Sequence, residues 1–198
     1  MKFEIGDKTD QALTTTLVHE LALCKESFDR FVYFAGQNIL GDDSKKIKIQ
    51  SYNSYASFLH HLYEFYIGCI KRELCDTSSP KSDISDRIIN SEAEKLLKNK
   101  RHAIENGYAP EWENHISVYQ VEVPNEFAGD FRKIRNRTAH ADLRRASPDN
   151  QLTMGEFYKR YHGFVYILYV QPHWLWTAKD IEAFDWKAIE EFDLAVRS

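Results

Sequence analysis

The sequence contains few residues that interrupt helices and few that form covalent or metal-linked crosslinks. Among 198 residues there are 5 prolines, 8 glycines and 3 cysteines. The glycines are scattered and form no phosphate-cradling loop, and no histidines have a metal-site spacing such as H-E-x-x-H. An odd number of cysteines without a C-x-x-C pair favours a reducing compartment and argues against a zinc ribbon. We therefore expect neither a metal site nor a cofactor.

Long apolar runs and a strong charge of one sign are also missing. The longest apolar run covers residues 164–170, whereas a membrane-spanning helix needs about 20 residues. Residues 1–10 contain scattered charges and no apolar stretch, so we expect no secretory signal. A net charge of −4 argues against a protein that coats nucleic acid with its whole surface. These absences favour a cytoplasmic protein without a membrane partner.

Composition and periodicity predict a single all-α domain that covers residues 1–198. Hydrophobic residues make up 43% of the chain and charged residues 28%, as in ordinary globular proteins. Apolar residues recur mostly at intervals of three and four, which is the spacing of amphipathic helices. We predict an antiparallel bundle of about five to six helices. Their expected ranges are Thr9 to about Leu40, Tyr52 to Ile70, Ile84 to about Asn106, Asn125 to about Ala141, Thr153 to Pro172, and Thr177 onward.

Several smaller features need their own interpretation. Residues 76–86 contain four serines and a proline, which predicts a mobile loop. Residues 116–121 fit either a short strand or an extended loop. His60 and His61 point about 100° apart on a helix and do not suit one ligand. Most tyrosines lie on apolar helix faces and are expected in the core, whereas the aromatic cluster at 172–176 is a candidate contact for RNA or a second subunit.

Basic charge is concentrated in one segment. Between Arg132 and Arg145 there are six basic residues and one acid, a local charge of +5. Such a cluster is typical of a surface that binds a phosphate backbone, although a solvated helix face is the commoner reason for clustered charge. Cleaving RNA without a metal requires a base for the 2′-hydroxyl proton, an acid for the leaving 5′ oxygen and a fixed positive charge. His140 and Arg135 have the side chains for these roles, and the product would end in a 2′,3′-cyclic phosphate.

Residues 135–140 read R-N-x-x-x-H, a pattern expected by chance about 0.02 times in a chain of this composition. This segment resembles the motif of the HEPN superfamily of small α-helical proteins, many of which are metal-independent ribonucleases. The resemblance implies a homodimeric endoribonuclease with a defence, stress or toxin role, in which Arg135, Asn136 and His140 are catalytic. The residues expected to hold the RNA backbone are Arg132, Lys133, Arg137, Arg144 and Arg145.

Helix geometry sets a condition on this hypothesis. On one straight helix Arg135 and His140 lie about 140° apart, whereas Asn136 and His140 share a face. Three arrangements would bring them together: the helix loosens near Thr138, the long arginine wraps around the helix, or two copies of the segment meet. Resemblance to HEPN proteins favours the third, a composite cleft in a homodimer.

The chain departs from one subgroup of the family. In HEPN toxins paired with a nucleotidyltransferase antitoxin, the motif commonly continues to a tyrosine two residues after the histidine. Asp142 occupies that place, so we do not expect regulation through a modified tyrosine, although an antitoxin or another regulatory protein stays a candidate partner. Two alternatives remain open: a HEPN-like module that binds a nucleotide, RNA or a protein without cleaving it, and a structural helical adaptor.

Overall fold

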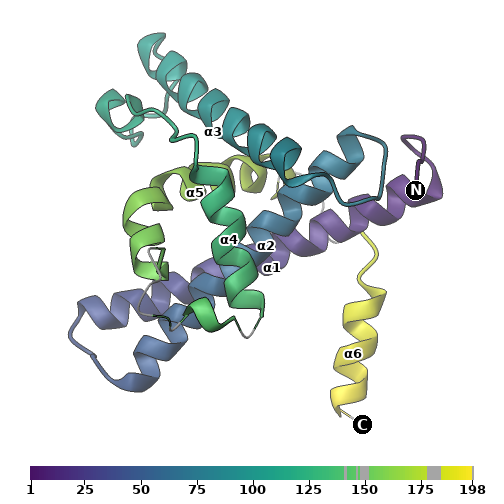
Figure 1. Ribbon diagram of the computed structural model, residues 1–198, viewed down its shortest axis with the longest axis horizontal. Coiled ribbons are helices and arrows are strands. Elements are labelled where there is room, and N and C mark those ends of the chain that lie inside the picture. The colour runs from purple at the N-terminus through teal and green to yellow at the C-terminus, as the bar shows by residue number, and fades with distance from the viewer. Residues whose placement is uncertain (141, 146, 148–151, 178–183, 198) are drawn as a thin grey trace.

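The computed structural model describes residues 1–140, 142–145, 147, 152–177 and 184–197, and for residues 173–177 it describes only the backbone. The described residues form six α-helices and two short 3-10 helices and contain no strand, which confirms the predicted all-α fold (Figure 1). The α-helices are α1 (Lys8–Ile39), α2 (Lys45–Glu73), α3 (Ser82–Glu105), α4 (Phe127–Ala139), α5 (Met154–Thr177) and α6 (Lys187–Arg197). The 3-10 helices are η1 (Ile116–Tyr119) and η2 (Leu143–Arg145).

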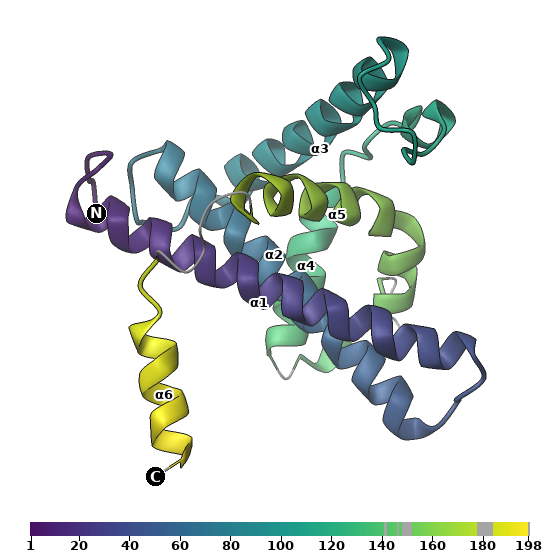
Figure 2. The same cartoon turned by 180° about the vertical axis from the view of Figure 1, so that it is seen from behind.

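Helices α1 and α2 form a long antiparallel pair, as their apolar stripes predict (Figures 1 and 2). A side-chain oxygen begins each helix, because Asp7 accepts from the backbone N–H of Asp10 at 2.8 Å and Ser44 accepts from that of Ile47 at 3.4 Å. Gly68 of α2 allows the helices to approach closely, since a Cβ atom there would overlap the side chain of Leu17. This pair is the platform on which the later helices pack.

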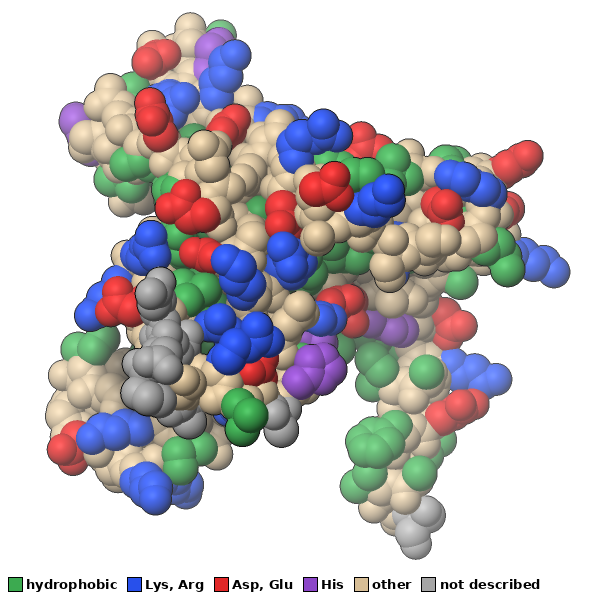
Figure 3. Space-filling view, viewed as in Figure 1, with side chains coloured by type: hydrophobic (Ala, Val, Ile, Leu, Met, Phe, Trp, Pro, Cys, Tyr) green, Lys and Arg blue, Asp and Glu red, His purple; other side chains and the backbone are tan. Residues whose placement is uncertain are grey.

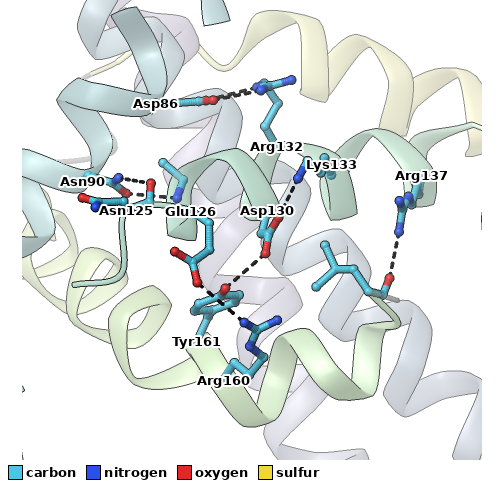
Figure 4. Close-up of polar contacts among 12 residues, drawn as sticks. Asp86, Asn90, Asn125, Glu126, Asp130, Arg132, Lys133, Arg137, Arg160 and Tyr161 are labelled. Carbon is cyan, nitrogen blue, oxygen red and sulfur yellow. Dashed lines mark hydrogen bonds and ion pairs between the residues drawn. The ribbon is translucent and has the colours of Figure 1, made fainter. Parts of the chain in front are cut away.

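Helix α4 packs against α2, α3 and α5, and carries the predicted motif into the middle of the molecule (Figure 1). Its apolar face is buried as predicted, with Phe127 and Phe131 fully buried and Ile134 only 3% exposed. Asn90 of α3 fixes the start of α4 by accepting from the backbone N–H of Ala128 at 3.0 Å and donating to the carbonyl of Asn125 at 2.8 Å (Figure 4). The start of α4 is therefore held against α3 by hydrogen bonds between the Asn90 side chain and the backbone as well as by apolar packing.

Three segments differ from the predictions. Residues 116–119 form η1, and not a strand or an extended loop, because Tyr119 is buried and its hydroxyl donates to Glu113 at 2.5 Å. Residues 82–86 of the expected loop at 76–86 form the first turns of α3. Pro172 does not end α5, which continues to Thr177. The missing N–H of a proline costs one helical hydrogen bond, and the burial of Leu168, Tyr169 and Pro172 favours continuation.

The chain ends in a helix that stands apart from the bundle (Figures 1 and 2). The helix expected from Thr177 onward begins at Lys187, and residues 178–183 and the side chains of Trp174 and Trp176 lie outside the described residues. The predicted apolar face of α6 is exposed, with Phe192 at 69% and Val196 at 67%. Among the described residues, no helix has the length and apolar character needed to cross a membrane.

Candidate functional site

The end of α4 brings two of the three predicted catalytic residues together. Ile134 faces the core, which turns the next residue, Arg135, toward α2. The guanidinium of Arg135 donates to Oδ1 of Asn136 at 2.8 Å and forms an ion pair with Glu64 of α2. Its carbon Cζ lies 5.7 Å from the centre of the Tyr63 ring. Arg135 is thus held against α2, and Asn136 is held by Arg135.

Only part of the Arg135 guanidinium is open to solvent. The Arg135 side chain is 21% exposed and that of Glu64 is 29% exposed. The Nε of Arg135 is buried and has no hydrogen-bond partner in the described part of the chain. An arginine has five N–H donors, so donors remain for a phosphate oxygen besides those that bind Asn136 and Glu64. The fixed guanidinium could therefore contact an anion without leaving its position.

His140 lies apart from this cluster. The helix ends at Ala139, and His140 adopts an extended backbone with φ −124° and ψ 158°. Its side chain is exposed, while its backbone N–H still donates to the carbonyl of Asn136 at 3.2 Å. No hydrogen bond joins Arg135 to His140 among the described residues. The helix does not loosen before Ala139, and the arginine turns toward Glu64 and not around the helix toward His140.

A second histidine lies close to Arg135. His60 is one helical turn before Glu64 on α2, and its Nδ1 is buried without a partner among the described residues. Burial lowers the pKa of His60, and the nearby Arg135 guanidinium lowers it further, so the ring is neutral near pH 7. The adjacent His61 points toward α1, where its Nδ1 lies 2.8 Å from Glu20. The planes of the two histidine rings are 81° apart, so the rings diverge as expected. In the described part of the chain, no three His, Cys, Asp or Glu side chains are placed to hold a metal ion.

Carboxylates of α4 itself and of a neighbouring helix neutralise part of the basic segment. Arg132 makes two hydrogen bonds to Asp86 of α3, at 3.1 and 2.8 Å, and Lys133 lies 2.8 Å from Asp130 (Figure 4). The ion pair with Asp86 raises the pKa of Arg132. On the surface above α4, basic side chains therefore alternate with acidic ones (Figure 3). The local charge is smaller than the sequence count of +5 suggests.

The remaining predicted RNA-binding residues follow α4. Arg144 lies 2.6 Å from Asp142, and its guanidinium lowers the pKa of that carboxyl to about 2. Arg137 donates to the backbone carbonyl of Leu152 at 2.8 Å (Figure 4), and Arg145 lies over the ring of Tyr52 with 6.0 Å between Cζ and the ring centre. Arg137 and Arg145 thus face a different side of α4 from the Arg135 cluster.

Two residues of this site, Glu64 and His60, were not predicted from the sequence. Both lie on a predicted helix whose other residues near them are mostly aromatic or apolar, and they are four positions apart, which puts them on one face. A carboxylate and a histidine on one face, among mostly apolar neighbours, are a signal that was present in the sequence. Their pairing with α4 required the tertiary structure.

Comparison with models of known families, with curated proteins and with solved structures finds no match to this chain.

Proposed function

We propose that this protein is a metal-independent endoribonuclease of the HEPN type, with its centre at Arg135, Asn136 and His140. One observation carries the proposal: a half-buried arginine is held by a carboxylate and an amide, and an exposed histidine follows it at the end of the same helix. A fixed guanidinium and a solvent-accessible histidine are two of the groups that transfer of a phosphoryl group without a metal needs.

The proposed reaction is an attack of the RNA 2′ oxygen on the adjacent phosphorus. A histidine takes the 2′-hydroxyl proton, the O2′–P bond forms and the P–O5′ bond breaks. A protonated histidine gives its proton to the departing 5′ oxygen, which leaves as a hydroxyl. The Arg135 guanidinium stabilises the negative charge that develops on the phosphorane oxygens. The products are a 2′,3′-cyclic phosphate and a 5′-hydroxyl end.

The separation of Arg135 and His140 within one chain favours a homodimer. Arg135 and His140 point in different directions, so two copies of the α4 end facing one another would supply an arginine from one chain and a histidine from the other. Helix α6 supports self-association, because Phe192, Leu194 and Val196 are all more than half exposed. Exposed apolar faces of this kind commonly mark protein interfaces.

The test is cleavage of a mixed pool of single-stranded and structured RNA in EDTA, with analysis of the product ends. We expect cyclic-phosphate ends from the wild type and a loss of at least about a hundredfold in rate for His140→Ala, because general acid–base catalysis is lost. His102→Ala is the matched control, since His102 is an exposed histidine on α3. Equal rates for His140→Ala and His102→Ala would contradict the proposal.

A binding module without cleavage is the second candidate. The observation that favours it is the pairing of Arg132, Lys133 and Arg144 with carboxylates, which leaves less charge for a long RNA backbone than expected. Such a module would bind its RNA or protein partner equally well as wild type and as His140→Ala, and neither form would cleave. The two candidates therefore give different product analyses in the same experiment.

A further inference from the structure

A pocket of about 600 Å³ lies on the other side of α4, between the paired ends of α1 and α2 and the start of α5. Four aromatic rings line it: Phe31, Tyr52, Tyr55 and Tyr158. Four basic side chains also line it: Lys48, Arg137, Arg145 and Lys159. No carboxylate is among the described residues that line this pocket. The pocket differs in this respect from the surface above α4, where acids and bases alternate.

The aromatic side of the pocket is held rigidly. Tyr55 is buried, and its hydroxyl lies 3.1 Å from Nδ1 of His162. Its ring packs against Phe31 at 4.7 Å and against Tyr158 at 5.3 Å between ring centres. Tyr52 and Tyr158 remain about two-fifths exposed, at 40% and 41%. Exposed rings beside a packed aromatic cluster suit stacking of a planar ring.

The basic side of the pocket is suited to an anion. Arg137 is positioned by its hydrogen bond to the carbonyl of Leu152. The residues that follow begin α5, where Thr153 accepts from the backbone N–H of Glu156 at 3.1 Å. The positive end of a helix dipole therefore adds to the arginine charges at this wall. In the described part of the chain, Lys48 and Lys159 pair with exposed carboxylates, Asp43 at 3.9 Å and Glu156 at 3.7 Å.

We propose that this pocket binds one nucleotide, with its base against the tyrosine rings and its phosphate against Arg137 and Arg145. An uncharged apolar ligand would leave the four basic side chains without a role, and inorganic phosphate would leave the rings without one. The nucleotide is either free in solution or one unit of an RNA strand. His140 does not line the pocket, so binding here does not depend on the proposed cleavage.

The experiment is calorimetric titration of the full chain with AMP, UMP, adenosine, inorganic phosphate and a short single-stranded RNA. At least one nucleotide form should bind more tightly than both adenosine and phosphate. Tyr52→Ala and Arg145→Ala should each weaken that binding about tenfold or more, because one removes stacking and the other a charged donor. The matched controls are Tyr33→Ala on α1 and Arg87→Ala on α3, two exposed residues outside the pocket.

The outcomes distinguish a free nucleotide from a unit of an RNA strand, and they distinguish this pocket from the proposed cleavage site. Binding of AMP or UMP that depends on Tyr52 and Arg145 indicates free nucleotides, and the same dependence for RNA alone indicates a unit of a strand. Binding that is unchanged in Tyr52→Ala and Arg145→Ala, or no binding by any nucleotide form, would overturn the inference. His140→Ala should bind like the wild type, so a failure of cleavage and a failure of this pocket are distinguishable.

Discussion

The most informative contact at the residue scale is the ion pair between Glu64 and Arg135, which links α2 to α4. Both side chains are less than a third exposed, so each loses part of its hydration on folding. The cost is offset because the guanidinium also contacts Asn136 and lies near the Tyr63 ring. Removing one partner leaves the other partly buried without its counter-charge, whereas removing both does not.

A double-mutant cycle on this pair should therefore show coupling. We expect Glu64→Ala and Arg135→Ala each to destabilise the protein, and the double variant to cost less than the sum of the two by about 1–2 kcal/mol. Urea unfolding of the four proteins measures this coupling. The control is the exposed pair Arg30 and Glu26, 3.7 Å apart, for which we expect at most about 0.5 kcal/mol. Equal coupling in the two pairs would contradict the structural role given to Glu64.

The part of the site that lies within one short segment of the sequence was predictable from the sequence. Arg135, Asn136 and His140 are within one short segment, and their spacing already indicated that Arg135 and His140 point apart. The acids that come from other helices were not predictable, since Asp86 is 46 positions from Arg132 and Glu64 is 71 positions from Arg135. Such pairs depend on how helices pack, and no pattern in the sequence specifies that.

At the scale of elements, the spacing of apolar residues predicted the helices of the bundle. A helix that buries one face needs apolar residues at intervals of three and four. The apolar face of α4 is buried, and Thr153, where the fifth helix was expected to begin, caps α5. The errors occurred where tertiary contacts outweighed a local rule. Pro172 is buried inside α5, and η1 forms around the buried Tyr119.

The contact that joins the start of α1 to the end of α2 should be sensitive to pH. Asp10 accepts from Arg72 at 2.6 and 3.1 Å and from the backbone N–H of Gly6 at 2.8 Å. The hydrogen bonds from Arg72 lower the pKa of Asp10 below its usual value of 3.8, so the folded state favours the carboxylate. This stabilisation is present above the pKa of the unfolded chain and is lost as the pH falls through the folded value.

Asp10→Asn should therefore reduce stability at pH 7 and have a smaller effect as the pH falls below 4. Urea unfolding of wild type and variant at pH 7, 4 and 3 measures the difference. Asp43→Asn is the control, because the Asp43 side chain is 93% exposed and lies 3.9 Å from its nearest basic group. A cost of Asp10→Asn that stays the same at all three pH values would show that the carboxylate charge is not what stabilises this contact.

At the scale of the whole molecule, the two faces of α4 have different proposed tasks. One face fixes Arg135 against α2, and the other contributes Ile134, Arg137 and Thr138 to the pocket beside α5. His140 lies at the end of the helix between them. In the proposed composite cleft, this exposed histidine of one chain would lie at Arg135 of the other.

Mixing two inactive variants tests that arrangement directly. Arg135→Ala and His140→Ala should each be inactive alone, whereas subunit exchange between them should restore part of the RNA cleavage. Recovery is expected because a mixed dimer contains one intact Arg135 and one intact His140, contributed by different chains to one cleft. Cleavage rates are measured after mixing at concentrations where sedimentation shows a dimer. Arg135→Ala mixed with the double variant is the control, since no dimer in that mixture has an Arg135. A monomer in sedimentation, or exchange without recovery, would mean that the site is not shared between chains.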